Sequence, residues 1–174
     1  MKVFRDSHKT LTVKGMKEKT SLRVEALGTV DELDAFVGAA RACCTDGNIR
    51  KELKGVQQDL RSLLAELAGA ARVITANDVS KLDTLIEKTE KPLPPLRNFI
   101  LTWNSPEASS LNVCRAVARR AERRLLALKK KEPVNEQAFR YLNRLSDVFF
   151  AMARLADKNA GFAGEKWNGR SEKL

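Results

Sequence analysis

The densest cluster of charge in the chain is RAVARRAERR, residues 115–124, which holds five arginines and one glutamate. On a helix, Arg115, Arg119 and Glu122 lie along one stripe, at steps of four and three residues. Arginines one turn apart repel each other unless an anion or a carboxylate lies between them, and their forked donors suit phosphate oxygens. Three interpretations compete: a solvated basic face, a nucleic-acid contact surface, and a cradle for a polyphosphate.

Two further polar clusters stand on segments with helical periodicity. YLNRLSD places Asn143 and Asp147 one turn apart on a helix that otherwise faces a core. Polar groups in such a place cost free energy unless they are paired, so this cluster is either a buried hydrogen-bonded network or the wall of a polar pocket. GTVDELDAF adds Asp31, Glu32 and Asp34 at a predicted helix start, where carboxylates also suit the helix dipole.

The charge of the chain favours an anionic partner. The 174 residues carry a net charge of +10 and an isoelectric point near 9.8, which suits nucleic acid, an acidic membrane surface or a phosphorylated small molecule. Only 6% of the residues are aromatic and none interleaves with the arginines, and the sequence shows no DNA-reading motif. Nucleic acid is therefore the weaker functional interpretation.

Cysteine and histidine usage removes several classes of chemistry. Cys43 and Cys44 are adjacent and Cys114 stands alone, a spacing that fits neither a zinc site nor a disulfide framework. We expect all three to be buried as small apolar residues. His8 is the single histidine, so a multi-histidine metal centre is ruled out, and we assign no metal ligand.

Hydrophobic periodicity predicts helices over residues 28–44, 48–74, 77–91, 107–131 and 135–160. Thr29 with Glu32 forms a capping-box pattern at the first helix, and Asn48 is the expected cap of the second. Ser105 followed by Pro106 opens the fourth. The segment PLPPL breaks the chain before it, because proline lacks an amide donor, and RNFILTWN continues as an extended apolar segment.

Each predicted helix carries an apolar stripe at three- and four-residue steps, which we expect to form the core. The members are Val30, Leu33, Val37 and Ala40; Leu53, Val56, Leu60, Leu63, Leu64 and Leu67; Val79, Leu82, Leu85 and Ile86; Leu111, Val117, Ala118, Ala121, Leu125 and Leu128; and Phe139, Leu142, Leu145, Val148, Phe149 and Met152. The sequence therefore predicts an all-α fold, a bundle of four long helices and one shorter one, in a single domain over residues 1–174.

The sequence shows no targeting or membrane-spanning segment. No apolar run approaches the roughly 20 residues that a membrane span needs. The start MKVFRDSHKT lacks the apolar region of a secretory signal. We therefore expect a cytoplasmic location and no membrane partner.

Four separated motifs together resemble one known family. The PduO-type ATP:cob(I)alamin adenosyltransferases contain, in the same order and spacing, motifs similar to VEALGTVDELDAFVGAA, LPPLRNFIL, CRAVARRAERRLLAL and YLNRLSDVFFAMAR, over roughly residues 23–157. The resemblance implies a ferritin-like five-helix bundle that assembles as a homotrimer with active sites between subunits. It also implies transfer of the 5′-deoxyadenosyl group of ATP to cob(I)alamin, with release of triphosphate and with Mg²⁺ accompanying the ATP.

The resemblance assigns the nucleotide side of the site. Arg119 matches the family's ATP-contacting arginine, Glu122 its glutamate partner, and Asn143 an asparagine close to the nucleotide. Lys9 and Thr10 stand where the family's TKTGDxGxT loop wraps the phosphates with backbone N–H groups.

Arg115 matches an arginine that pairs across the subunit interface with an aspartate, here Asp31. Phe99 matches the aromatic residue that crowds the lower face of cobalt. This crowding displaces the lower axial ligand and makes Co(II) easier to reduce to nucleophilic Co(I). The expected catalytic set is Arg115, Arg119, Glu122, Asp31 and Phe99.

The chain departs from the family pattern at three places. The Gly-Asp of the N-terminal loop is replaced by Leu11 and Thr12, two glycines of a turn by Trp103 and Asn104, and a histidine by Asn112. Two function classes stay open on this basis. One is an active adenosyltransferase, and the other is a non-catalytic relative that binds ATP or a corrinoid as a sensor or carrier.

The resemblance also sets expectations for the termini and for protein partners. Residues 1–22 are expected to form a flexible nucleotide-binding loop. The excess of basic over acidic residues in this segment favours phosphate contacts by the side chains of Lys9, Thr10 and Lys14, and a disordered basic tail stays open as the alternative. Residues 161–174 are expected to form a C-terminal tail. A cobalamin reductase or a B12-dependent enzyme is the expected protein partner.

Overall fold

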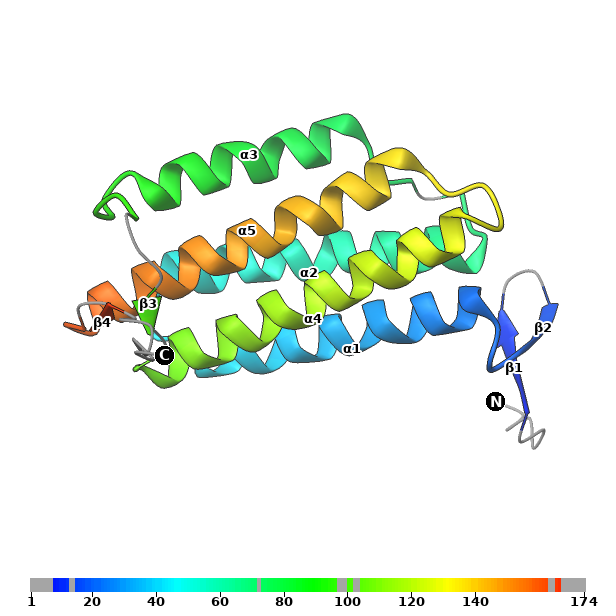
Figure 1. Cartoon of the computed structure of the whole chain (residues 1–174), viewed down its shortest axis with the longest axis horizontal. Coiled ribbons are helices and arrows are strands. Elements are labelled where there is room, and N and C mark those ends of the chain that lie inside the picture. The colour runs from blue at the N-terminus through cyan, green and yellow to red at the C-terminus, as the bar shows by residue number, and fades with distance from the viewer. Residues whose placement is uncertain are drawn as a thin grey trace, which may run out of the picture.

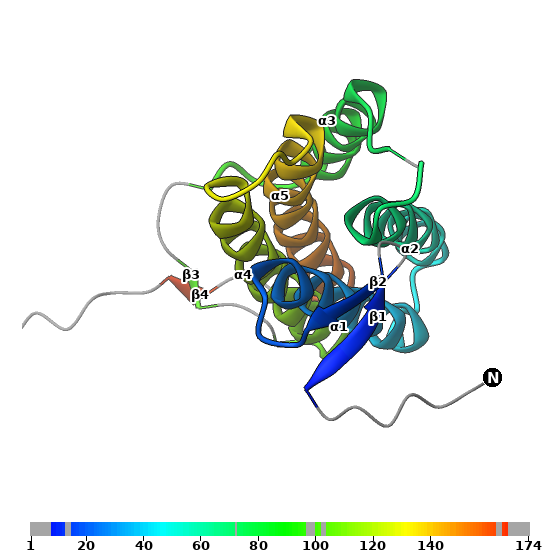
Figure 2. The ribbon, with the colours of Figure 1, turned by 90° about the vertical axis from the view of Figure 1, so that its right-hand side faces the viewer.

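Five α-helices account for most of the chain: α1 Leu22–Cys43, α2 Gly47–Ala68, α3 Ala76–Glu90, α4 Pro106–Lys129 and α5 Glu136–Asn159. The computed structural model describes residues 8–12, 15–71, 73–96, 100–101, 104–162 and 165–166. The helices α1, α2, α4 and α5 run side by side (Figure 1), and α3 lies outside them against α5 (Figure 2). The predicted five-helix bundle is confirmed. Within the described residues, no helix is both long and apolar enough to cross a lipid bilayer.

Two short antiparallel strand pairs accompany the helices, so the chain is not wholly helical. The strand β1 Lys9–Thr12 pairs with β2 Gly15–Glu18 inside the segment expected to be a flexible loop. The strand β3 Ile100–Leu101 pairs with β4 Glu165–Lys166, which belongs to the expected C-terminal tail. Figure 1 shows that the two pairs lie at opposite ends of the bundle.

The first helix begins well before the predicted capping box. Ser21 caps α1, and its Oγ accepts a hydrogen bond from the Val24 amide at 3.4 Å. Thr29 lies inside the helix, where it is buried and its Oγ1 donates to the Glu25 carbonyl oxygen at 2.8 Å. The predicted start at Thr29 is wrong, because a mid-helix threonine satisfies its hydroxyl on the preceding turn without acting as a cap.

The helix α2 differs from the prediction at both ends. Asp46 caps it in place of Asn48, since Asp46 Oδ1 accepts from the amides of Asn48 at 2.8 Å and Ile49 at 3.2 Å. The helix stops at Ala68, where Gly69 adopts a φ of 100° and its N–H bonds carbonyl groups of the last turn. A left-handed glycine ends a helix in this way, so the predicted continuation beyond it is wrong.

The helix α4 begins as predicted. Ser105 is its N-cap, and the Ser105 Oγ accepts from the Ala108 amide at 3.1 Å. Pro106 is the first helical residue, a position where its missing N–H and fixed φ carry no penalty.

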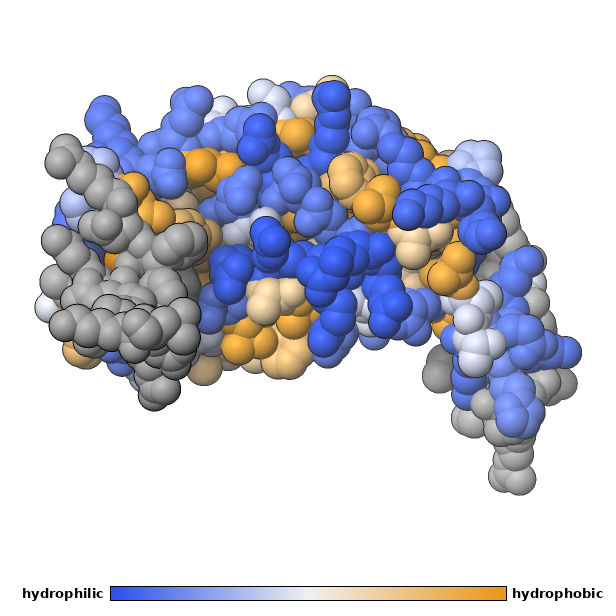
Figure 3. All heavy atoms as spheres, viewed as in Figure 1, coloured by the Kyte–Doolittle hydropathy of each residue, from blue (hydrophilic) through white to orange (hydrophobic). Residues whose placement is uncertain are grey.

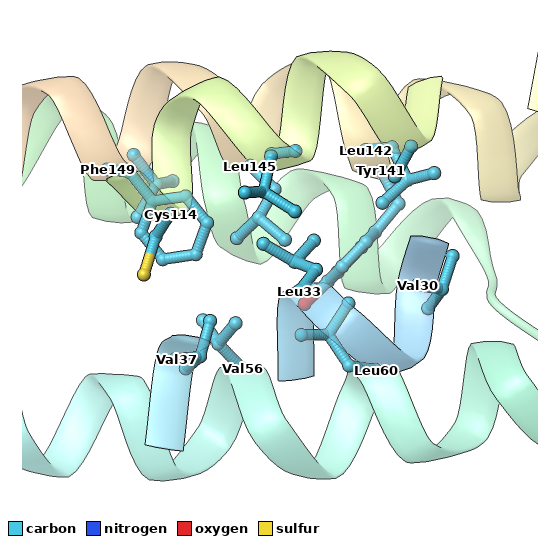
Figure 4. Packing of buried hydrophobic residues seen from close by; sticks show 14 of the residues in the cluster. Val30, Leu33, Val37, Val56, Leu60, Cys114, Tyr141, Leu142, Leu145 and Phe149 are labelled. Carbon is cyan, nitrogen blue, oxygen red and sulfur yellow. The ribbon is translucent and has the colours of Figure 1, made fainter. Parts of the chain in front are cut away.

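The predicted apolar stripes form one core between the helices. All predicted members on α1 and α4 are buried, and in Figure 4 Leu33 lies among Leu60, Leu145 and Tyr141. On α3, Leu82 is the only predicted member that is buried, because α3 packs mainly on α5 from outside. The predicted core residues that are half-buried are Leu64, Val79, Leu85, Ile86 and Phe139.

Tyr141 is a core residue that the apolar stripes did not include. Its ring is fully buried, and its hydroxyl donates to Asp59 Oδ2 on α2 at 3.0 Å. Burial raises the pKa of both groups. A buried phenol needs an acceptor for its hydroxyl, so this hydrogen bond ties α5 to α2 across the core.

The three cysteines differ in exposure, which corrects the expectation that all are buried. Cys44 and Cys114 are buried, whereas Cys43, the last residue of α1, is exposed. Burial raises the pKa of the Cys114 thiol to about 12. Burial, together with a hydrogen bond from the thiol to Glu107, raises the pKa of Cys44 to about 12.

We expect one thiol to react rapidly with Ellman's reagent in the native protein at about pH 8, and three to react after unfolding. The thiolate is the nucleophile, and thiols with a pKa near 12 stay protonated under these conditions. Cys43→Ser should abolish the rapid phase. Two or more rapid equivalents in the native protein would contradict the burial of Cys44 and Cys114.

Candidate functional site

The helix α4 carries two of the predicted arginines without a carboxylate between them. Arg115 is half-buried, and its Nε donates to Asn112 Oδ1 at 2.8 Å on the same helix. Arg119, one turn later, is exposed and makes no ion pair within the described part of the chain. Burial and the charge of Arg119 lower the pKa of Arg115. An anion bound between the two guanidinium groups would relieve this repulsion.

Glu122 and Asn143 come together across two helices. The Asn143 Nδ2 on α5 donates to Glu122 Oε1 on α4 at 2.8 Å. Glu122 lies one turn after Arg119, so an acidic and an amide side chain adjoin the arginines on this side of α4. The structure therefore brings Arg115, Arg119, Glu122 and Asn143 into one surface, which we call the arginine face.

The other arginines of the cluster have a different role. Arg120 pairs with Glu32 of α1, and Arg124 Nε lies 3.0 Å from Glu25 Oε1, also of α1. These pairs neutralise two charges of α4 against its packing partner. The sequence pattern did not reveal them, because Glu25 and Glu32 lie roughly 90 residues away in the chain.

The acidic cluster of α1 divides into an exposed and a buried member. Asp31 is exposed and forms no ion pair among the described residues, so it does not meet Arg115 within the chain. Asp34 is buried, with Oδ2 2.7 Å from Arg61 Nη2 of α2 and with Oδ1 lacking a hydrogen-bond partner. The expectation of simple helix capping is wrong for both, because α1 begins earlier.

Three of the polar residues of the NRLSD motif lie on the surface, whereas Ser146 is buried. Asn143, Arg144 and Asp147 are exposed, which excludes the buried network considered for this motif. Arg144 Nε lies 2.9 Å from Asp83 Oδ1 of α3, and Arg144 Nη1 lies 3.4 Å from Asp147 Oδ2. Arg144 therefore links α5 to α3, Asp147 pairs with Arg144 on the same helix, and Asn143 alone of the three belongs to the arginine face.

The remaining predicted site residues belong to the two ends of the bundle. Lys9 and Thr10 lie on β1, where Lys9 is exposed with its Nζ 3.7 Å from Glu18 Oε1. Phe99 lies outside the described residues, directly before β3. The hairpin lies at one end of the bundle, and the β3–β4 pair lies at the other end, near the start of α4 (Figure 1). The ends of α4 are roughly 36 Å apart for a helix of 24 residues.

The described residues contain no group of three or more His, Cys, Asp or Glu side chains that could hold a metal ion. Mg²⁺ in nucleotide sites is bound mainly by substrate phosphates and water, with one or two protein oxygens. Glu122 Oε2 and the Asn143 side-chain carbonyl adjoin the arginines and are oxygen atoms of this kind. The residues present therefore fit a magnesium ion that arrives with a nucleotide.

Comparison with known proteins shows which family the chain belongs to. The family model for cobalamin adenosyltransferases matches residues 4–156. The chain belongs to the cobalamin adenosyltransferase family. The corrinoid adenosyltransferase of Bacillus subtilis (strain 168) is 40% identical over 164 residues, which cover 90% of this chain and 85% of that protein. The corrinoid adenosyltransferase PduO of Salmonella typhimurium is 40% identical over 82% of this chain, which spans only 44% of that longer protein.

Solved structures of this family share the fold. A variant of a PduO-type corrinoid adenosyltransferase from Lactobacillus reuteri, complexed with ATP, matches with a TM-score of 0.88 at 30% identity, over 94% of this chain and 97% of that one. Another variant of the same enzyme, complexed with cobalamin and ATP, matches with a TM-score of 0.87 at 28% identity, over 94% and 96% of the two chains. The predicted cobalamin adenosyltransferase-like bundle is confirmed.

Proposed function

We propose that this protein is a corrinoid adenosyltransferase, which transfers the 5′-deoxyadenosyl group of ATP to the cobalt of cob(I)alamin. The observation that carries the proposal is the unneutralised pair of Arg115 and Arg119, on a chain that is 40% identical to a corrinoid adenosyltransferase over nine-tenths of its length. The cobalt electron pair forms the new bond to C5′, and the C5′–oxygen bond breaks. Its electron pair leaves with triphosphate.

The residues of the arginine face act on the leaving group. Triphosphate gains negative charge as the bond breaks, and Arg115 and Arg119 stabilise that charge from fixed positions. Asn143 holds the Glu122 carboxylate at 2.8 Å, which leaves Glu122 oriented toward the nucleotide side. Holding ATP in line with cobalt lowers the barrier by limiting the orientations that the reactants must search. Mg²⁺, when bound, offsets charge on the phosphates.

We assign Phe99 to the corrinoid side, where an aromatic side chain displaces the lower axial ligand of cobalt. The support is its place in LPPLRNFIL, next to the strand β3 that pairs with the C-terminal segment. Loss of the lower ligand favours reduction of Co(II) to the nucleophilic Co(I) state. A cobalamin reductase that supplies this electron, or a B12-dependent enzyme that takes the product, is the expected partner, and the cytoplasmic location stays a prediction.

A non-catalytic relative that binds ATP or a corrinoid is the second candidate. The observation that favours it is the N-terminal segment, where Leu11 and Thr12 of β1 replace the Gly-Asp of the family loop. The two functions separate in one assay, which follows the formation of adenosylcobalamin from ATP and chemically reduced cobalamin. A binder would retain both ligands without forming the product.

Arg119→Ala should weaken ATP binding by about 1.5–3 kcal/mol, since that is the typical contribution of a hydrogen bond to a charged group. Adenosylcobalamin formation should fall with it, while the circular dichroism spectrum is retained. Arg123→Ala is the matched control, because Arg123 is an exposed arginine one turn further along α4 and also lacks an ion pair in the described structure. If calorimetry gives the same ATP affinity for both variants and the wild type, Arg119 does not bind ATP and belongs to a solvated basic face.

We further propose a homotrimer with composite active sites. Asp31 of α1 is exposed and Arg115 of α4 has no carboxylate partner among the described residues, so each is available to the other across a subunit interface. Large apolar side chains are also exposed on these two helices, including Phe36 and Val113. Figure 3 shows apolar groups gathered below the hydrophilic band that crosses this face.

Light scattering should give about three times the chain mass of 19.4 kDa. Asp31→Arg should split the assembly, because it places two cations opposite each other, and adding Arg115→Asp should restore the mass by exchanging the charges. A wild-type monomer, or a double variant no more assembled than Asp31→Arg alone, would contradict the pairing. Circular dichroism of each variant checks that the monomer remains folded.

The hairpin β1–β2 is proposed to contact phosphate through lysine side chains. Lysine is a point charge without the geometry of a backbone anion loop, so these contacts should be weakened strongly by salt. Deleting residues 1–19 should lower ATP affinity and flatten its dependence on salt, whereas deleting residues 1–7 leaves the hairpin intact and should change neither. Unchanged ATP binding and adenosyl transfer after the longer deletion would show that the hairpin has no part in the site.

A further inference from the structure

The connection between α3 and α4, residues 91–105, is held at both ends by the last turns of α5. At its start, Lys158 Nζ donates to the Pro92 carbonyl oxygen at 2.5 Å, and Arg154 Nη2 donates to the Pro94 carbonyl oxygen at 2.6 Å. At its end, Asp157 accepts hydrogen bonds from the residues that lead into α4. We call Arg154, Asp157 and Lys158 the α5 clamp; Figure 1 shows this end of α5 beside β3 and β4.

Asp157 is the buried member of the α5 clamp, with 4% of its surface exposed. Its Oδ1 accepts from the Ser105 backbone N–H and from the Ser105 hydroxyl, both at 2.9 Å, and its Oδ2 accepts from the Asn104 amide at 3.3 Å. A buried carboxylate is costly unless it is hydrogen-bonded. Here these donors and the partial positive charge at the N-terminus of α4 stabilise it.

The α5 clamp holds the connection almost entirely through its backbone. Pro92 and Pro94 have a fixed φ and no N–H to donate. The hydrogen bonds to their carbonyl groups therefore set the direction in which the start of the connection runs. The pairing of β3 with β4 adds another backbone contact. Contacts of this kind do not depend on the side chains of the residues whose backbone groups are bound.

The polar side chains of the α5 clamp are not explained by a ligand in the cavity next to them. This cavity has a volume of about 420 Å³ and lies between the ends of α1, α2, α4 and α5. Its described carboxylates are already bonded: Asp46 caps α2 and accepts from Asn159 Nδ2 at 3.0 Å, and Glu107 accepts from Cys44 and Thr45. Asp157 in turn accepts hydrogen bonds from Asn104 and Ser105 of the connection.

We propose that Asp157 is a positioning residue for adenosyl transfer, and that Arg154 and Lys158 assist it by holding the other end of the same connection. The proposal rests on the proposed function, because Phe99 stands in the middle of this connection in the sequence and is assigned to the corrinoid side. ATP is held on α4 by the arginine face and does not depend on the connection. Loss of the α5 clamp therefore weakens the use of the corrinoid and leaves ATP binding intact.

The test compares Asp157→Asn with Glu107→Gln in the full chain. Glu107 is a buried carboxylate at the same end of α4, but its partners Cys44 and Thr45 lie outside the connection. Hydrogen exchange followed by mass spectrometry reports whether the amides of residues 91–105 are released. Steady-state kinetics gives the KM for cob(I)alamin, calorimetry gives the Kd for ATP, and the cob(II)alamin spectrum with ATP reports the lower axial ligand.

In Asp157→Asn we expect about tenfold faster exchange at residues 104–105 and about a tenfold higher KM for cob(I)alamin, the effect of losing one charged hydrogen-bonding partner. The fraction of cob(II)alamin without a lower ligand should fall, and the Kd for ATP should not change. Glu107→Gln should lower the Tm without any of these effects. Lys158→Met, an exposed substitution that will not prevent folding, should shift the same readings in the same direction to a smaller extent.

Each other result overturns the proposal. Unchanged exchange in Asp157→Asn would show that the carboxylate does not hold the connection, and faster exchange with unchanged corrinoid kinetics and spectrum would show that holding it has no functional consequence. Equal effects in Glu107→Gln would reduce Asp157 to a general stabiliser of this end of the bundle. If Asp157→Asn does not fold, Lys158→Met decides by the same readings. A wild-type chain that forms no adenosylcobalamin would refute the proposed function instead. Amide hydrogen exchange in residues 91–105 would then be the only test of whether the α5 clamp holds the connection.

Discussion

The helix α4 must bury one face against α1 and α5 while it carries five arginines within ten residues on the rest of its surface. Packing is strong enough to impose this crowding, because the apolar stripe of α4 is removed from water along almost its whole length. The repulsion among these arginines is offset by carboxylates at some of them and not at others. Glu25 and Glu32 of α1 neutralise Arg124 and Arg120. These two ion pairs therefore also stabilise the packing of α4 against α1. Arg115 and Arg119 have no carboxylate partner among the described residues, and burial together with the charge of Arg119 lowers the pKa of Arg115.

The same helix is also held near both of its ends by polar contacts. At the N-terminus, the buried carboxylates of Asp157 and Glu107 bind the chain entering α4 and the connection between α1 and α2. Toward the C-terminus, Arg23 grips Glu132 with two hydrogen bonds, at 2.7 and 3.2 Å, and also the Leu67 carbonyl at 2.7 Å. A site on a helix fixed in this way keeps its geometry without support from its ligands. The hairpin β1–β2 and the connection between α3 and α4, to which we assign phosphate and corrinoid contacts, lie toward these two ends (Figure 1).

The existence, order and inner faces of the helices were predictable, because apolar residues at three- and four-residue steps mark a buried stripe wherever it lies in the chain. The errors are at helix ends and at polar residues. Thr29 fits a capping box in sequence, yet in the structure the helix starts at Leu22 and the threonine satisfies its hydroxyl on Glu25. The choice between Asp46 and Asn48 as a cap was equally open to sequence reasoning, since both side chains suit that role. The hairpin was missed because its pairing depends on local registry that shows no apolar alternation.

The sequence by itself determined the family, the five-helix bundle and the four residues of the arginine face, which are Arg115, Arg119, Glu122 and Asn143. It could do so because motif order and helical spacing are properties of the chain alone. Only the tertiary structure decided which of the arginines are available. Arg120 and Arg124 differ from Arg119 through partners on another helix, far away in the sequence. It also decided that Asp34 is buried while Asp31 is exposed, and that Asp157, which no motif marks, holds the chain leading into α4. The physical reason is the same in each case. The burial and the ion-pair partners of a side chain depend on which elements pack side by side, and the sequence of a single helix does not specify its neighbours.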